Sequence, residues 1–559
     1  MPAAAAGTAH SEPARAAAAK TTTHYAIGKR ACKPPKKPGL AACFAEIRIR
    51  VKAGTKGAHK FKIGAGATAA GTIGPAGGLT PSDLATAYGL TTTGGSGQTV
   101  AIVDAYNDPN INADLQTFDA QYGLAACSTT NGCLQVVNET GGTTLPANDT
   151  TGWSLEETLD VQTVHSVCQG CKIILVEANS ADNSDLETAE NTAVTLKATE
   201  VSNSFGEAEA NSDSAFQSAF NHPGVVITAS SGDDGYYSFD QEAATDEPNI
   251  PAAYNTVVAV GGTSLYLGQT AARQSETVWN DNGTQDYFES QLLIPLGAGG
   301  GGCSTMFPAQ GWQTHLSVWA STGCGSNRLV ADVSAVADYL TGFDIYDSYN
   351  CGTACSPAPG WLTIGGTSLS SPLIAATYAL AGGAQGVSYP SLILYGHSGS
   401  SYDVTTGGNG WCDGEGAAQC GDPNTLGFGT VDCDYAANGT IAAGDRACDA
   451  LAGYDGPTGV GTPKGITVFK KTGPSAKISG PTSIVHGTSG TWTAATTDPF
   501  PGGAVTSYKW NWGDGTTTTT TTGSAAHTYT TGGVSRTITL TVTDNYAQTG
   551  TATFAVTVS

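Results

Sequence analysis

Apolar and polar positions follow two different patterns along this chain. From residue 79 onward, short apolar runs of strand length are separated by segments whose apolar residues recur with helical spacing. The expected strands cover residues 99–106, 172–178, 198–206, 225–235 and 256–265, and the expected helices cover residues 154–167 and 185–198. Short strands that alternate with amphipathic helices predict an α/β fold, in which helices cover both faces of a parallel sheet.

The second pattern begins near residue 470. Residues 476–559 are rich in threonine and show period-two alternation in segments such as 506–515 and 536–559. This pattern is typical of a small immunoglobulin-like β-sandwich. We therefore expect a central α/β domain over residues 79–470 and a β-sandwich domain over residues 476–559.

The N-terminal segment, residues 1–78, fits neither pattern. It is rich in alanine, lysine, threonine and glycine, it has a proline-rich turn at residues 33–39, and its single expected strand covers residues 44–53. Such low-complexity composition predicts a poorly ordered leader or a short pro-segment.

Charge separates the segment from the rest of the chain. The protein has 24 basic and 47 acidic residues, and residues 1–62 hold thirteen of the basic ones but only two acidic ones. An acidic body is a poor candidate for binding nucleic acid, whose phosphates require clustered Lys and Arg. The chain contains no run of about 18 apolar residues, which is the length that would predict a membrane span. Only 13% of residues are charged, which limits the change in charge on protonation and suits an acidic environment.

The fourteen cysteines indicate an oxidising compartment. They fall into close pairs that predict local disulfides: Cys32/Cys43, Cys127/Cys133, Cys168/Cys171, Cys303/Cys324, Cys351/Cys355, Cys412/Cys420 and Cys433/Cys448. The spacing of Cys168 and Cys171 also fits a redox or zinc half-site, but no second Cys-x-x-Cys or His pair completes one. We therefore expect a secreted, extracellular protein, although residues 1–10 lack the layout of a signal peptide.

Ser368 is the first candidate for chemistry. It follows a Gly-Gly-Thr turn and opens an apolar helix, so the turn exposes its hydroxyl while the helix N-terminus supplies positive potential. The alternative is a serine that only caps the helix. The His-Gly-Thr sequence at His486 imitates a catalytic histidine motif, but it lies in the expected sandwich, and we interpret it as unrelated to Ser368.

A pair of carboxylates offers Ser368 a base. Glu156 and Asp160 are four residues apart on an expected helix and therefore share one face. When two carboxylates lie this close, the pair loses its two protons at different pH values, so one group can accept a proton while the other carries one. The same spacing also occurs on ordinary solvated helix faces. Glu157 and His165 lie on the same segment, and we expect them to be structural or solvent-facing.

Asp233 lies in a glycine-bounded turn that follows an expected strand. A protonated carboxyl at such a turn could donate a hydrogen bond to an oxyanion. The alternative is an ordinary Asp-Gly turn.

Taken together and in this order, the motifs resemble the sedolisin (serine-carboxyl peptidase) family, which has a subtilisin-like fold. The resemblance covers residues 78–465 and implies that Ser368 is the nucleophile, Glu156 the general base, Asp160 its orienting partner and Asp233 the oxyanion donor. It also implies that Ser204, Phe205 and Gly206 form a substrate-binding strand end, with Phe205 where many members have Trp. Asp104 matches the place of an additional carboxylate in some members.

The resemblance further implies one Ca²⁺ ion near the end of the catalytic domain. Asp403 and Asp455 would supply carboxylates, and Val404, Leu451 and Gly453 would supply backbone carbonyls. The alternative is two turns anchored by aspartates.

The C-terminal domain resembles a PKD-type module in the segments 510–515, 527–529 and 541–545. We expect this module to bind a substrate matrix or a cell surface. Its alternating aromatics, Tyr508, Trp510 and Trp512, form either an adhesive strip or the core of the module.

The expected function is that of a secreted, acid-active serine peptidase, either an endopeptidase or a tripeptidyl-peptidase, that acts on proteins or peptides as a monomer. Two alternatives remain: a Ser-His-Asp subtilase, for which the central domain lacks a His-Gly-Thr sequence, and a non-catalytic binding protein on an inactive peptidase fold.

Overall fold

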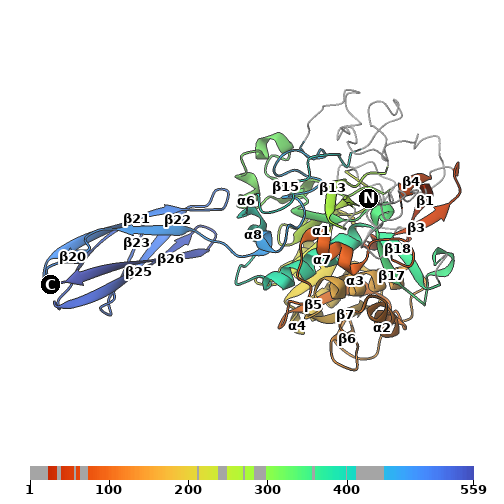
Figure 1. The fold of residues 1–559 in the computed structure, drawn as a ribbon, viewed down its shortest axis with the longest axis horizontal. Coiled ribbons are helices and arrows are strands. Elements are labelled where there is room, and N and C mark those ends of the chain that lie inside the picture. Colours follow the sequence, from red (N-terminus) through yellow and green to blue (C-terminus); the bar gives the residue numbers. More distant parts are fainter. Residues whose placement is uncertain are drawn as a thin grey trace, which may run out of the picture.

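An eight-stranded sheet forms the centre of the larger part of the molecule in this computed structural model (Figure 1). Its strand order is β13-β12-β10-β8-β5-β7-β6, with β16 also paired to β12, and β13 is the antiparallel member. The strands are β5 Thr99–Ala105, β6 Leu134–Asn138, β7 Lys172–Ala178, β8 Glu200–Asn203, β10 Val226–Ser230, β12 Val258–Leu267, β13 Arg273–Val278 and β16 Val333–Val336. The expected α/β fold with a parallel sheet is confirmed.

The structure describes residues 23–33, 39–55, 58–62, 74–210, 213–236, 248–268, 271–281, 297–355, 359–397, 399–410 and 446–559. In this part of the chain, no helix is both long enough and apolar enough to span a membrane.

Both faces of the sheet are covered. Four consecutive residues of β5, Val100 to Val103, are fully buried, and successive side chains of a strand point to opposite faces. Helices α3 (Trp153–Val167) and α7 (Thr367–Ala381) pack against each other and against the sheet, while α4 (Asn183–Thr195) packs on β5 and β7. This packing places the N-terminal turns of α3 and α7 close together. Within the described ranges, the other α-helices are α1 Pro81–Tyr88, α2 Ile111–Tyr122, α6 Gly311–Thr314 and α8 Ser391–Tyr395.

The N-terminal segment is part of this globular body. The expected strand at residues 44–53 is present as β3, but it is joined by β1 and β4 in a second sheet of order β17-β18-β3-β1-β4. These strands are β1 Thr23–Arg30, β3 Glu46–Val51, β4 His59–Lys62, β17 Phe343–Tyr346 and β18 Trp361–Gly365. The expectation of little order is therefore wrong for the described part of residues 1–78, because Phe44 and Ile47 are buried and β3 pairs with β18, a strand of the globular body.

Three short strands form a small sheet of order β11-β9-β2. They are β2 Ala42–Cys43, β9 Phe205–Ala208 and β11 Asn249–Ile250, and a separate hairpin joins β14 Gly302–Pro308 to β15 Asn327–Val330. The strand β9 continues directly from the end of β8, so this small sheet lies at the carboxyl edge of the central sheet.

The C-terminal module is a β-sandwich that extends away from the globular body (Figure 1). One sheet contains β19 Ser475–Ser479, β21 Ser489–Thr497 and β24 Ser524–Thr528; the other contains β20 Ser483–Ile484, β22 Val505–Asn511, β23 Thr517–Thr520, β25 Val534–Asp544 and β26 Thr549–Val558.

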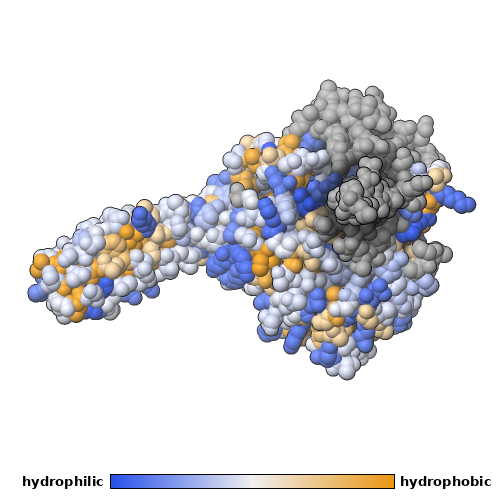
Figure 2. Space-filling view, in the orientation of Figure 1, coloured by the Kyte–Doolittle hydropathy of each residue, from blue (hydrophilic) through white to orange (hydrophobic). Residues whose placement is uncertain are grey.

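The alternating aromatic residues of β22 and the following turn lie in the core of this module. Trp510 and Trp512 are fully buried and their rings stack at 5.6 Å, and Tyr508 is also buried. The alternating aromatics are therefore core residues and not an adhesive strip: Tyr508, Trp510 and Trp512. On the visible face of the module, polar and apolar residues are interspersed (Figure 2).

Disulfides link five of the expected pairs: Cys32–Cys43, Cys127–Cys133, Cys168–Cys171, Cys303–Cys324 and Cys351–Cys355. The pair at residues 168 and 171 is thus a disulfide and not half of a zinc site. Cys448 is disulfide-bonded, whereas Cys412, Cys420 and Cys433 lie outside the described residues.

Candidate active site

Helix α3 carries the two carboxylates that the sequence analysis singles out. It begins at Trp153, after Gly152, whose φ of 112° lies in the left-handed region. Glu156 and Asp160 follow one turn apart, and both side chains are fully buried. Their shared face is directed at α7 and not at solvent, so the pair is not part of an ordinary solvated helix face.

Ser368 is the second residue of α7 and is also fully buried. The preceding Gly366 has a φ of 95°, and a side chain there would overlap the carbonyl oxygen of Phe44 and lie 2.7 Å from Asp233 Oδ2. Glycine is therefore required at this turn both for its backbone conformation and for space. The Ser368 hydroxyl donates to the carbonyl oxygen of Ser204 at 3.2 Å.

Ser204 connects the nucleophile to the acidic pair. Its hydroxyl donates to Asp160 Oδ2 at 2.7 Å, while its carbonyl oxygen accepts the bond from Ser368. Sequence analysis assigns Ser204 to substrate binding and does not anticipate the bond to Asp160. The local sequence does not indicate this bond, because residues 160 and 204 lie on separate segments that meet only when the domain folds.

Burial dominates the electrostatics of the pair. Removal from water raises the pKa of Glu156 well above its usual range, and the nearby Asp160 and Asp104 raise it further, while the nearby Ser368 hydroxyl opposes the rise. Burial likewise raises the pKa of Asp160, and the hydrogen bond from Ser204 and the nearby Glu156 carboxyl oppose the rise. Coupled carboxyls of this kind hold protons that separate carboxyls would lose.

The acidic cluster extends beneath the pair. Burial raises the pKa of Asp104 on β5, and Asp160 and Glu177 add to the rise. Asp104 lies beside Glu177 in the register of β5 and β7, and Glu177 has a pKa raised to about 9, chiefly by burial. The structure thus places Asp104 beside Asp160, as the resemblance to serine-carboxyl peptidases implies.

Asp233 follows β10 and faces the first turn of α7. Its Oδ1 accepts bonds from the backbone amide of Thr367 at 2.7 Å and from the Thr367 hydroxyl at 2.8 Å. Its Oδ2 faces Gly366, where a Cβ would lie 2.7 Å from this oxygen. These bonds fix the carboxyl beside Ser368, in a position from which its second oxygen can face a developing oxyanion.

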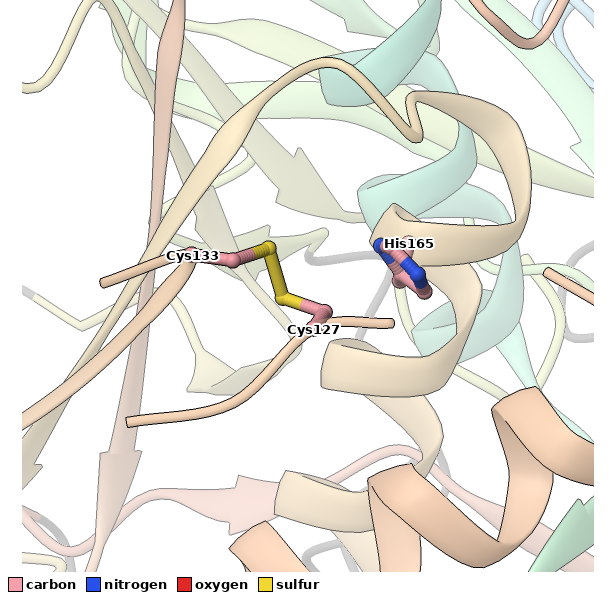
Figure 3. Close-up of side chains that lie close together, drawn as sticks. All are labelled: Cys127, Cys133 and His165. Atoms are coloured by element: carbon pink, nitrogen blue, oxygen red, sulfur yellow. A yellow bond between two sulfur atoms is a disulfide. The ribbon is translucent and has the colours of Figure 1, made fainter. Parts of the chain in front are cut away.

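The other titratable residues of α3 are structural. Glu157 and His165 are fully buried, so of the two expected positions, structural or solvent-facing, both residues take the structural one. His165 Nε2 is 2.7 Å from the carbonyl oxygen of Ala125 and 3.2 Å from Asp119 Oδ1. It lies near the disulfide between Cys127 and Cys133 (Figure 3). Because both sulfurs are bonded to each other, this group does not offer thiolates to a metal.

The residues expected to bind calcium lie together. The amide of Gly453 donates to Asp403 Oδ2 at 3.1 Å, and the amide of Leu451 donates to Asp455 Oδ2 at 2.9 Å. Asp455 and Val404 are buried, whereas Asp403 is exposed. Burial raises the pKa of Asp455, and the nearby Asp403 contributes a smaller rise.

This arrangement fits a hard cation. Two carboxylates are close enough to repel each other, and the bonds found for Asp455 among the described residues come from neutral donors, namely Leu451 and Thr458. Oxygen ligands of this kind suit Ca²⁺. The donor set therefore supports the expected ligands Asp403, Val404, Leu451, Gly453 and Asp455, whose coordination remains a prediction.

Comparisons with known proteins agree with this geometry. Residues 138–387 match the subtilase family, and residues 471–558 match the PKD domain. The chain is 30% identical over 422 residues to kumamolisin from Bacillus sp. (strain MN-32), with 72% of the chain and 65% of kumamolisin covered. It is 29% identical over 350 residues to sedolisin from Pseudomonas sp. (strain 101), with 59% of the chain and 54% of sedolisin covered.

A solved structure supports the same relation. The structure of Pseudomonas sedolisin, a serine-carboxyl proteinase complexed with two molecules of pseudo-iodotyrostatin, superposes with a TM-score of 0.53 at 27% identity, covering 70% of this chain and 96% of that one. The chain spans less than two thirds of the curated relatives it matches. It combines a subtilase-type peptidase domain, homologous to sedolisin and kumamolisin, with a C-terminal PKD domain.

Proposed function

We propose that this protein is a secreted serine-carboxyl peptidase that hydrolyses peptide bonds of proteins in acid, as an endopeptidase or a tripeptidyl-peptidase. The observation that carries the proposal is the link through Ser204, which bonds both to Ser368 and to Asp160. Through this link a serine at a helix N-terminus is joined to a buried acidic pair. The disulfides and the PKD domain support an extracellular location.

Each residue has a role in this proposal. Ser368 Oγ attacks the substrate carbonyl and passes its proton to Glu156, after exchanging its bond to Ser204 for one to that carboxylate. Asp160 stabilises the proton on the pair, and Glu156 returns it to the departing amine. Water then attacks the ester carbon on Ser368 and gives a proton to Glu156, which passes it to Ser368 Oγ as the ester bond breaks. The protonated Asp233 donates a hydrogen bond to the oxyanion and keeps its proton, in a position set by its two bonds from Thr367.

Proton occupancy explains why the reaction requires acid. Asp233 donates only while it is protonated, so activity declines as pH rises through its pKa. Glu156 accepts only when the pair has lost one proton, so activity declines again at very low pH. Two such requirements give a bell-shaped dependence of rate on pH.

The remaining proposed roles follow from the similarity to sedolisin and kumamolisin. Substrate would pair with Ser204, Phe205 and Gly206 at the start of β9. One Ca²⁺ ion would be held by Asp403, Asp455 and the carbonyls of the intervening loop, where it would neutralise the two carboxylates and fix the loop. The PKD domain would bind a substrate matrix or a cell surface, and the protein would act as a monomer.

A pH series tests the proposal. We expect hydrolysis of a denatured protein substrate to be highest in the acid part of a range from about pH 3 to 8, and to be lost in both Ser368→Ala and Glu156→Gln. Neutral activity that survives Glu156→Gln would contradict the carboxylate mechanism. Inactivity of the unaltered protein at every pH would identify a binding protein on an inactive peptidase fold.

A further inference from the structure

A cleft lies where α1, α2 and α3 come together. Its walls are the first turn of α1, the loop that follows α1, the end of α2 and the C-terminal end of α3, and α3 packs against both other helices. The volume of the cleft is about 410 Å³. This value lies within the range of roughly 300–1,000 Å³ that is usual for sites of small molecules, so the cleft has room for a monosaccharide or a disaccharide.

The cleft is separate from the candidate active site. Ser166, which lines the cleft, and Glu156, the candidate base, both belong to α3. Ten residues of an α-helix span about 15 Å. Glu156 lies near the N-terminal end of α3, whereas the cleft lies at its C-terminal end. A ligand in the cleft would therefore not compete with a peptide on β9.

The described residues that line the cleft are all uncharged. Asp83, in the first turn of α1, is held in the helix cap, where its carboxylate accepts bonds of 2.8 Å from the amide and the hydroxyl of Thr80. Burial raises the pKa of the Tyr122 hydroxyl, so this lining residue also stays neutral. A charged ligand would lose its hydration here without gaining an opposite charge, which is costly. The cleft therefore favours an uncharged ligand.

The polar side chains of the lining offer both donors and acceptors. Gln169 Nε2 donates to Thr92 Oγ1 at 3.1 Å, and the Ala125 amide donates to Gln169 Oε1 at 3.3 Å. A primary amide has two N–H donors and two acceptor lone pairs, so one of each remains beyond these two bonds. Ser166 Oγ donates to the carbonyl oxygen of Gln162 at 2.6 Å and keeps its lone pairs as acceptors. A matching ligand must both donate and accept, as hydroxyl groups do.

Apolar surface lies beside these polar groups. Pro81 and Ala85 line the cleft from α1, and Tyr122 lines it from the end of α2. The Tyr122 ring is held by edge contacts with Phe118 and Trp361, with ring centroids 4.9 and 5.6 Å apart. A side chain that is already fixed loses little conformational entropy when a ligand packs on it. Apolar surface next to hydroxyl-binding groups suits a sugar, which has C–H faces and hydroxyl edges.

We propose that the cleft between α1, α2 and α3 is a binding site for an uncharged monosaccharide or disaccharide. An extended peptide usually binds by pairing its main chain with a free strand edge. The walls of this cleft are helix ends and loops, so a sugar fits it better than a peptide does. The site goes beyond the proposed peptidase function and does not depend on it.

Saturation-transfer NMR and isothermal titration calorimetry test the site in the full chain carrying Ser368→Ala. The probes are the methyl glycosides of glucose, mannose, galactose and N-acetylglucosamine, together with maltose and lactose. We expect at least one of them to bind with a Kd on the order of 1 mM. Ala85→Trp should weaken this binding at least about tenfold, because the indole would fill the cleft from a partly buried position. Thr86→Trp, at an exposed position outside the lining, should bind as the parent does.

A second variant separates loss of the site from loss of the fold. Gln169→Leu keeps a similar side-chain volume without the amide, and it should weaken sugar binding by about 3- to 10-fold while the Tm shows that the protein remains folded. Glucose 6-phosphate should bind more weakly than glucose, and N-acetyl-alanyl-alanine amide should not displace the bound sugar.

Four results would each overturn the proposal. They are no binding of any uncharged sugar, equal binding in Ala85→Trp, tighter binding of glucose 6-phosphate than of glucose, and displacement of the sugar by the blocked dipeptide. The last two would identify a charged ligand or a peptide as the occupant of the cleft. None of these measurements requires peptide hydrolysis, so their failure would leave the proposed peptidase function standing.

Discussion

Replacement of Ser204 by alanine tests the connection between the nucleophile and the acidic pair. The change removes the hydroxyl that donates to Asp160 Oδ2 at 2.7 Å in a fully buried position. A hydrogen bond to a charged group contributes about 1.5–3 kcal/mol, and one pKa unit corresponds to about 1.4 kcal/mol. Loss of the bond should therefore raise the pKa at which the Glu156/Asp160 pair first ionises by about 1–2 units.

The sign of the effect on activity follows directly. The pair must lose a proton before Glu156 can act as a base, so a higher pKa moves the acid limb of the rate profile to higher pH. Below that limb, kcat/KM of Ser204→Ala should fall by about 10- to 100-fold relative to the unaltered protein, with a smaller difference at the upper end of the active range.

The assay is kcat/KM for a short peptide substrate measured across the acid range. Ser370→Ala is the matched control, because Ser370 is equally buried near Ser368 but donates to the carbonyl oxygen of Thr367 and not to a carboxylate. Its acid limb should stay in place. An unshifted limb in Ser204→Ala, with activity reduced evenly at every pH, would show that Ser204 contributes only to substrate binding and would refute the reasoning.

Three further predictions concern stability, geometry and calcium. Burial raises the pKa of Glu190 to about 8, so the folded state holds a proton that the unfolded chain loses above about pH 4.5, and stability falls as pH rises through this window. In a Ser368→Ala background, Glu190→Gln should therefore raise the free energy of unfolding, measured by chemical denaturation, by about 3 kcal/mol more at pH 7 than at pH 4. The control Glu187→Gln should show a much smaller difference, because the pKa of Glu187 is raised only to about 6. Equal effects of Glu190→Gln at both pH values would contradict this account. Gly366→Ala should retain the fold by circular dichroism but lose about 100-fold in kcat/KM, because its Cβ would enter the space beside Ser368; full activity would show that the turn has room to adjust. Calcium should raise the Tm of the unaltered protein, a chelator should reverse this, and Asp403→Asn should reduce the shift; a shift unaffected by the substitution would place the ion elsewhere.

The local sequence was sufficient to predict the elements that carry the chemistry. The four-residue spacing of Glu156 and Asp160 predicted a shared helix face, and both lie on one buried face of α3. The Gly-Gly-Thr-Ser turn predicted a helix that begins at the candidate nucleophile, and α7 begins at Thr367. Helical and strand periodicity are local properties, since they depend on which side chains alternate along one element.

The same reasoning did not predict the N-terminal segment. Residues 1–78 have the composition of a leader, and only the apolar alternation of residues 44–53 indicated order. Its strands form because β3 pairs with β18 and β2 pairs with β9, in each case with a partner far along the chain. Such pairing depends on closing long loops, and composition carries no information about which distant edge is free.

The sequence by itself determined the candidate residues for the proposed chemistry, because Ser368, Glu156, Asp160 and Asp233 each lie in a local context that such a role requires. Only the tertiary structure decided how these residues act on one another. It buried the carboxylates and so raised their pKa values, it placed the Ser204 hydroxyl on Asp160, and it joined the Phe44 amide to the carbonyl oxygen of Ser204. The physical reason is that burial and contacts between distant residues arise when separate elements pack, whereas spacing along one element is fixed before they do.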